Sequence, residues 1–135
     1  MLEKYLPCVA QGLLSAIFIR AGIGHCLEFE KMQGAIATQG VPDLLALMMA
    51  IGGILLLLGG GLSILVGYKT AWGAIAVILF LILATLMFHW QLTDPQEQIQ
   101  FFKNLGLIGG LLLLLERGAG PLSLDARQSS RLGQD

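Results

Sequence analysis

Charged side chains are scarce in this sequence. Asp, Glu, Lys and Arg make up 13% of its 135 residues, whereas hydrophobic residues make up 56%. Ordinary soluble domains carry roughly 25% charged residues, because charge covers the surface around a buried core. The formal net charge is -1 and the chain has no run of Lys or Arg, which argues against a nucleic-acid partner. The composition predicts a membrane protein surrounded by lipids.

Residues that bind metals are equally few. The chain has two cysteines and two histidines, and it contains neither a C-x-x-C nor an H-x-x-x-H pattern. Protein metal sites usually draw three or four ligands from such patterns. Cys8 and Cys26 would lie ~27 Å apart on one helix, too far for a disulfide. We therefore expect no metal site, no resident cofactor and no complete set of catalytic residues.

Long apolar runs are abundant. A helix needs about 20 apolar residues to cross roughly 30 Å of hydrocarbon. The sequence predicts transmembrane helices at about 5–27, 44–67, 70–90 and 97–115. The expected fold is therefore an all-α membrane protein, a compact four-transmembrane-helix bundle over residues 1–116. Residues 117–135 are polar and rich in Gly, Pro and Ser, so we expect a tail that is partly disordered.

The distribution of basic residues predicts the orientation. Four spans place both termini on one face of the membrane. That face carries Lys4, Lys69, Arg117, Arg127 and Arg131. The opposite face carries Lys31 and Lys103, so the positive-inside bias predicts cytoplasmic termini. Apolar residues of the 28–42 loop share one helical face, which predicts a short helix at the membrane surface.

Glycines concentrate inside the predicted spans. Because lipid supplies little hydrophobic force between helices, small residues allow the close backbone contacts that hold membrane helices together. The residues expected to pack in this way are Gly59, Gly60, Gly61, Gly106 and Gly110. These faces could pack within the bundle, form a homo-oligomer, or dock another membrane subunit.

A polar segment, FHWQLTDPQEQIQFFKNLG, interrupts the apolar sequence at 88–106. Asp94 and Pro95 have the pattern of a helix start, and Glu97 would complete a capping box with Asp94. Trp90 lies where a span should meet the headgroups, which is typical of an interface anchor. Local helix capping thus explains much of the polarity of this segment, but not all of it.

The remaining polar residues predict a site. The expected topology brings five side chains to one depth at the end of the bundle opposite the termini, namely Arg20, His25, His89, Lys103 and Asn104. A guanidinium inside a span costs at least a few kcal/mol unless it finds a partner or water. Two interpretations stay open: an ion-pair cluster that fixes the register of the helices, or a pocket for a quinone-like, lipidic or small anionic ligand.

Several motifs resemble the DoxX family of small four-helix membrane proteins. They are AGIGHCLEFEKM after the first span, QGVPDLLALMMAIGGILLLLGGGLSILVGYKTAW through the second and third, ILATLMFHWQLTDPQEQIQFFKNLGLIGGLLLL, and GPLSLDAR. Many relatives carry a lysine at the position of His25 and an acidic residue near Leu57, and both are missing here. A mechanism that depends on a buried carboxylate in the second span is therefore not expected.

The resemblance implies a bacterial inner-membrane location and a redox setting, because the family takes its name from a membrane subunit of a thiosulfate:quinone oxidoreductase. We expect an accessory membrane subunit that docks other membrane or redox proteins. The first alternative is a quinone-linked redox subunit, with quinone as its ligand. The second is a small transporter, which the absence of ionisable residues from the middle of the second and third spans disfavours.

Overall fold

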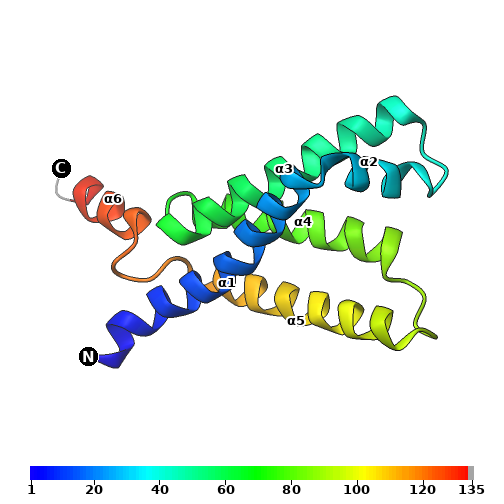
Figure 1. Ribbon diagram of the computed structural model, residues 1–135. Coiled ribbons are helices and arrows are strands. Elements are labelled where there is room, and N and C mark those ends of the chain that lie inside the picture. Colours follow the sequence, from blue (N-terminus) through cyan, green and yellow to red (C-terminus); the bar gives the residue numbers. More distant parts are fainter. Residues whose placement is uncertain (134–135) are drawn as a thin grey trace.

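The computed structural model describes residues 1–133, which fold into helices joined by short connections (Figure 1). The helices are α1 (Leu2–Leu27), α2 (Phe29–Ala37), α3 (Asp43–Val66), α4 (Thr70–Phe88), α5 (Pro95–Arg117) and α6 (Leu124–Leu132). Helices α1, α3, α4 and α5 are long and apolar enough to cross a membrane. The predicted all-α class with four spanning helices is confirmed, and α2 lies where the sequence predicts a short helix.

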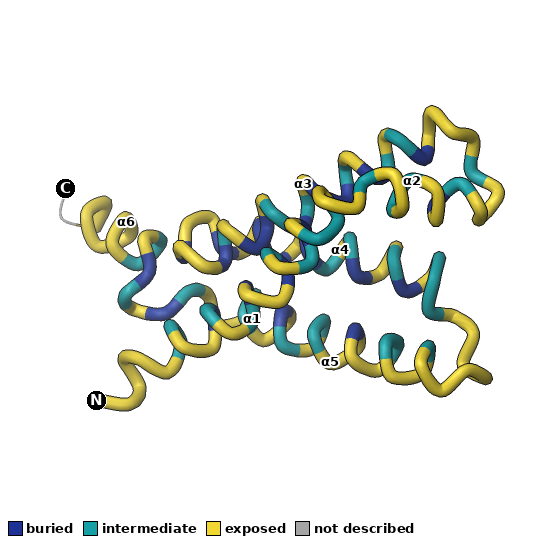
Figure 2. The backbone as a smooth tube through the Cα atoms, viewed as in Figure 1, coloured by how far each residue is buried: buried dark blue, intermediate teal, exposed yellow. Residues whose placement is uncertain are grey.

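Helix α3 is central to the packing. It contacts α1, α2 and α4, and α5 packs on the other side of α4. The main core draws on four helices through Phe18, Leu57, Ile64, Val77, Leu81 and Leu111. Buried residues are concentrated on α3 and α4, whereas α5 buries only Asn104 and Leu111 (Figure 2). Most of the surface of α5 is therefore free to face lipid or another protein.

Glycines let α3 approach its neighbours closely. A Cβ added at Gly60 would lie 2.8 Å from the carbonyl oxygen of Gly73 in α4 and 2.5 Å from Cγ2 of Val77. At Gly61 it would lie 2.9 Å from Cγ1 of Ile19 in α1. Since no side chain fits at these distances, the two glycines set the helix separations.

The other predicted packing glycines are placed differently. An added Cβ would meet no atom within 4 Å at Gly59 or Gly106, in the part of the chain that the structure describes. At Gly110 it would touch Leu14 of α1 at an ordinary 3.8 Å. The glycine faces at 59 and 106 thus contribute no contact between helices of this chain.

The α3–α4 turn is closed by the tail. Gly67 ends α3 in the left-handed region (φ 70°). The carboxylate of Asp125 accepts hydrogen bonds from the backbone N–H groups of Lys69 (2.7 Å) and Thr70 (2.9 Å). The N–H of Asp125 donates to the carbonyl of Gly67 at 2.8 Å. Asp125 therefore caps the first turn of α4, where backbone donors lack helical partners.

Much of the tail is helical: the structure describes it to residue 133 and has α6 at Leu124–Leu132. The Ser123 hydroxyl accepts a hydrogen bond from the N–H of Ala126 and so starts α6. Although partial burial alone would raise the pKa of Asp125, the N–H donors of Thr70 and Lys69 outweigh it and lower this pKa below its ordinary value. A polar, glycine-rich composition was compatible with disorder, but specific hydrogen bonds order this segment.

The bundle has two unlike ends. The "tail end" comprises the N-terminal half of α1, the end of α3, the 67–69 turn, the beginning of α4, and α6, which lies on the same side as the N-terminus (Figure 1). The "cavity end" comprises α2, the beginning of α3, the end of α4 and the beginning of α5. These names are used below.

Candidate functional site

A cavity of about 570 Å³ occupies the cavity end. Helices α2, α3 and α4 supply most of its wall, which is largely apolar and includes Met32, Ile36, Met49, Phe80, Met87 and Phe88. Two adjacent glycines of α3, Gly52 and Gly53, also line it, and an added Cβ at Gly53 would lie 3.1 Å from Met32 Cε and from Phe80 Cε2. The volume lies within the range of small-molecule pockets, roughly 300–1,000 Å³.

Three ionisable side chains face this apolar wall. They are His25 from the end of α1, His89 directly after α4, and Glu97 from the first turn of α5. His89 Nδ1 and Glu97 Oε2 are 2.5 Å apart, and both side chains are partly buried, at 24% and 30% exposure. Each is thus shielded from solvent but still reachable by a ligand.

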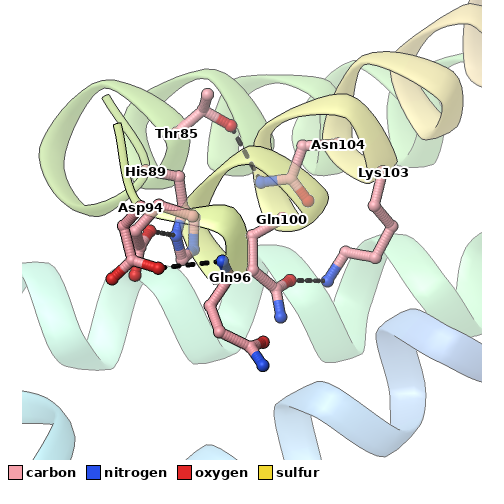
Figure 3. A network of polar contacts seen from close by, with 8 residues as sticks. Thr85, His89, Asp94, Gln96, Gln100, Lys103 and Asn104 are labelled. Atoms are coloured by element: carbon pink, nitrogen blue, oxygen red, sulfur yellow. Dashed lines mark hydrogen bonds and ion pairs between the residues drawn. The ribbon is translucent and has the colours of Figure 1, made fainter. Parts of the chain in front are cut away.

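Backbone capping positions this pair. The N–H of His89 donates to the carbonyl of Thr85, which ends α4 and directs the imidazole toward α5. The Asp94 side chain accepts from the N–H of Gln96 at 2.9 Å and fixes the start of α5 (Figure 3). The predicted N-cap at Asp94 is therefore present. The carboxylate of Glu97 reaches His89 instead of closing the predicted capping box.

A second polar contact joins α4 to α5 beside the cavity. The amide nitrogen of Asn104 donates to the hydroxyl of Thr85 at 2.8 Å, and both side chains are buried (Figure 3). Leaving either partner unpaired would cost about 1–3 kcal/mol. This bond fixes the register between α4 and α5, and thereby the position of Glu97 relative to His89.

The other predicted site residues lie outside the cavity. Lys103 is exposed and donates to Gln100, its neighbour on α5. Trp90 is 63% exposed and packs against the ring of Phe101, with centroids 6.4 Å apart. Its role as an interface anchor stays a prediction.

Arg20 is separated from the other predicted site residues. It is exposed and lines a groove formed by α1 and the end of α3. Ile19, the residue before Arg20, lies against Gly61 of α3. The adjacent Gly60 faces Val77 of α4. His89 lies twelve residues beyond Val77, about 18 Å further along α4 at 1.5 Å per residue. Arg20 is thus nearer the tail end.

The reason for this separation is the position of α1. Arg20 would lie level with the cavity end only if all four spans ended at the same level. Gly22 instead faces Leu57 and Leu58, well inside α3, and α2 packs along the remainder of α3. The structure therefore brings His25 and His89 to one cavity, with Asn104 adjacent, and leaves Arg20 and Lys103 elsewhere.

The cavity suits a mostly apolar molecule with a polar head. Methionine and aromatic side chains accommodate apolar rings and chains, while an imidazole beside a carboxylate can donate or accept a hydrogen bond. Sequence reasoning missed Glu97 as a site residue because its capping pattern offered a sufficient local explanation. Within residues 1–133, no group of three or more His, Cys, Asp or Glu side chains is placed to hold a metal ion.

These features define a small polytopic membrane protein with an apolar cavity at one end of its helix bundle. Residues 10–90 match the family model described as DoxX. The chain belongs to the DoxX family, as the motifs of its sequence suggested. The matched segment includes Arg20, His25 and His89 but ends before Glu97.

Relatives of known location agree with the four spans. The chain is 35% identical to inner membrane protein YqjF of Escherichia coli (strain K12) over 124 residues, 92% of each chain. It is 27% identical to inner membrane protein YphA of the same organism over 127 residues, 90% of this chain and 89% of that one. The protein is therefore a multi-pass protein of the inner membrane.

A shorter stretch of the chain is similar to a eukaryotic protein. ER-derived vesicles protein ERV29 of Saccharomyces cerevisiae is 34% identical over 80 residues, which cover 56% of this chain and 26% of ERV29. No solved structure matches the chain.

Proposed function

We propose that the protein binds a quinone-like molecule at the cavity end and serves as a quinone-linked membrane redox subunit. The observation that carries this proposal is the apolar cavity of about 570 Å³ with the His89–Glu97 pair in its wall. A quinone has an apolar ring and tail and two carbonyl oxygens that accept hydrogen bonds. Its reduction takes up two electrons and two protons.

The residues divide this task by their chemistry. Met32, Met49 and Phe88 provide apolar contacts, and His89 would donate a proton or hydrogen bond to a carbonyl oxygen of the ligand. Glu97 would stabilise the imidazolium form of His89 before that transfer. Electrons would come from a partner protein's cofactor, which is the reason for proposing a subunit rather than a complete enzyme.

The orientation is part of the proposal. Basic residues are more numerous at the tail end, including Lys4, Lys69 and Arg117, and this excess supports cytoplasmic termini. The cavity would then lie in the outer half of the membrane.

A filled cavity tests ligand binding. We expect the purified protein in lipid nanodiscs to bind a short-chain ubiquinone, measured by calorimetric titration. Ala84→Phe places a ring in the cavity and should weaken binding at least about tenfold, the change expected when a buried group loses its space. The matched control Ala76→Phe, on the same helix but in a separate surface groove, should bind normally.

The contrary results are clear. Failure of the unmodified protein to bind the quinone, or equal binding by Ala84→Phe, would refute the proposal. Glu97→Gln should bind the quinone but shift the pH dependence of its reduction in membranes. An unchanged pH profile would refute the assigned role of the His89–Glu97 pair.

A second candidate function is the docking of other membrane subunits. The exposed face of α5 supports it. Gly106 and Gly109 both present open backbone on this helix, and large apolar side chains such as Phe102 and Leu113 are exposed beside them. A partner helix could approach closely along such a surface. The two functions are compatible, since a quinone-binding subunit needs an electron donor.

A further inference from the structure

Arg20 is a charge in a spanning helix without a protein partner. The structure gives it no hydrogen bond and no ion pair among residues 1–133, and its groove contains no acidic side chain. An unpaired guanidinium in the hydrocarbon region costs at least a few kcal/mol. A counter-ion from outside the chain would remove much of this cost.

The groove beside Arg20 has the shape for an elongated apolar group. It measures about 370 Å³ and is lined by Gly12, Ser15, Ala16, Ile19, Ile23 and Leu65. The hydroxyl of Ser15 donates to the carbonyl of Gly12 at 3.1 Å, so its proton is used within α1. An added Cβ at Gly12 would meet nothing within 4 Å of the described chain, which shows that this part of the groove is open.

Helix geometry indicates the leaflet of the membrane toward which the Arg20 side chain extends. Side chains on a helix lean toward its N-terminus, over the preceding turns. For Arg20 those turns contain Ala16 and Gly12, both small, and they lead toward the tail end. The guanidinium can therefore extend along its own groove toward the headgroups on that side of the membrane.

We propose that Arg20 binds the phosphate of an anionic phospholipid from the leaflet at the tail end, with an acyl chain lying in the groove toward Ile23. A guanidinium matches phosphate through two parallel hydrogen bonds, and phosphate is an anion that the membrane itself supplies. An anionic lipid is favoured over a zwitterionic one, because an ethanolamine group carries its own cation to compete for the phosphate. This site is independent of the quinone cavity.

Native mass spectrometry of the purified protein can test the site. We expect retention of phosphatidylglycerol in preference to phosphatidylethanolamine or diacylglycerol. Arg20→Gln should reduce phosphatidylglycerol binding about tenfold, as expected for loss of a charge-assisted hydrogen bond. The control Lys103→Gln removes an exposed cation at the other end of the bundle and should bind the lipid normally.

A second variant tests the groove separately from the charge. Ile23→Phe keeps Arg20 and the small residues Ala16 and Gly12 along its side chain but fills the path of the acyl chain, so it should also reduce lipid binding. Equal binding of diacylglycerol and phosphatidylglycerol, or normal lipid binding by Arg20→Gln, would overturn the proposal. So would a protein that copurifies in fixed ratio with the unmodified chain and is lost with Arg20→Gln. Quinone binding by Arg20→Gln should remain unchanged in every case.

Discussion

Glycine residues have different structural roles at the two ends of the bundle. At the tail end, Gly60 brings α3 against the backbone of α4 at Gly73. At the cavity end, Gly52 and Gly53 instead line a space of about 570 Å³. One end is therefore held by backbone contact and a helix cap, with only an open surface groove beside them, whereas the other end contains a cavity between its helices. The comparison shows that a glycine-rich span can provide both the rigid frame and the room for a ligand.

The largest effect should follow from filling the closed contact. Gly60→Leu would force a side chain against Gly73 and Val77, and overpacking of this kind costs about 3 kcal/mol or more when backbone must move. We expect loss of a monodisperse folded protein in mild detergent, measured by thermal denaturation with size-exclusion detection. The control Gly59→Leu faces open space and should retain near-normal stability. Similar stability of the two variants would contradict the assignment of Gly60 to the contact between α3 and α4.

A smaller effect is expected from loss of the helix cap. Asp125→Asn keeps one accepting oxygen but replaces the other with an NH2 group, so one of the two hydrogen bonds from the N–H groups of Lys69 and Thr70 is lost together with the charge, at a cost of about 1 kcal/mol. Faster hydrogen exchange in α6 and at the start of α4 should report this change. Glu116→Gln, which alters an exposed carboxylate nearby, should leave exchange unaffected. A wild-type exchange pattern in Asp125→Asn would show that the cap does not hold the tail.

The same cap predicts a dependence on pH. Because the folded pKa of Asp125 is lowered from its ordinary value of 3.8, its contribution is fully present above that value. The contribution is lost as pH falls through the lower folded pKa. The difference in α6 protection between the unmodified protein and Asp125→Asn should therefore be constant near neutral pH and shrink in strong acid.

The smallest effect on stability is expected on the open face of α5. Gly106→Leu should change the unfolding free energy by only about 0.5 kcal/mol or less, since the added side chain meets no atom of the described chain. If α5 docks a partner subunit, the same variant should reduce the size of the native complex on blue-native electrophoresis of membranes. Gly59→Leu, on a different open face, provides the matched control. An unchanged complex in Gly106→Leu would count against docking through this face.

Apolar runs predicted the spanning helices well. The expected spans 44–67 and 70–90 differ by only one or two residues from α3 (Asp43–Val66) and α4 (Thr70–Phe88). Helix length follows from the thickness of hydrocarbon, so it can be inferred locally. The N-cap at Asp94 was predictable for the same reason, because its partner is two residues away.

Features that depend on distant residues were not predictable. The depth of Arg20 depends on how far α1 is displaced along α3, which the contacts of Gly22 and Gly61 determine. The pairing of Glu97 with His89 depends on the register that Asn104 and Thr85 impose. These contacts join residues that are distant in the chain, so the local sequence around each residue does not predict them. The structure brings His25 and His89 to one cavity and leaves Arg20 and Lys103 outside it.

The cap that Asp125 places on α4 affects the order in which the molecule is assembled. Thr70 and its cap are 55 residues apart in the chain, so α4 is synthesised and inserted long before the carboxylate that completes its first turn exists. Until then the backbone N–H groups at the start of α4 can form hydrogen bonds only with water or lipid headgroups. The cap on α4 can therefore form only after α5 has been synthesised and has brought the following segment to the tail end of the bundle.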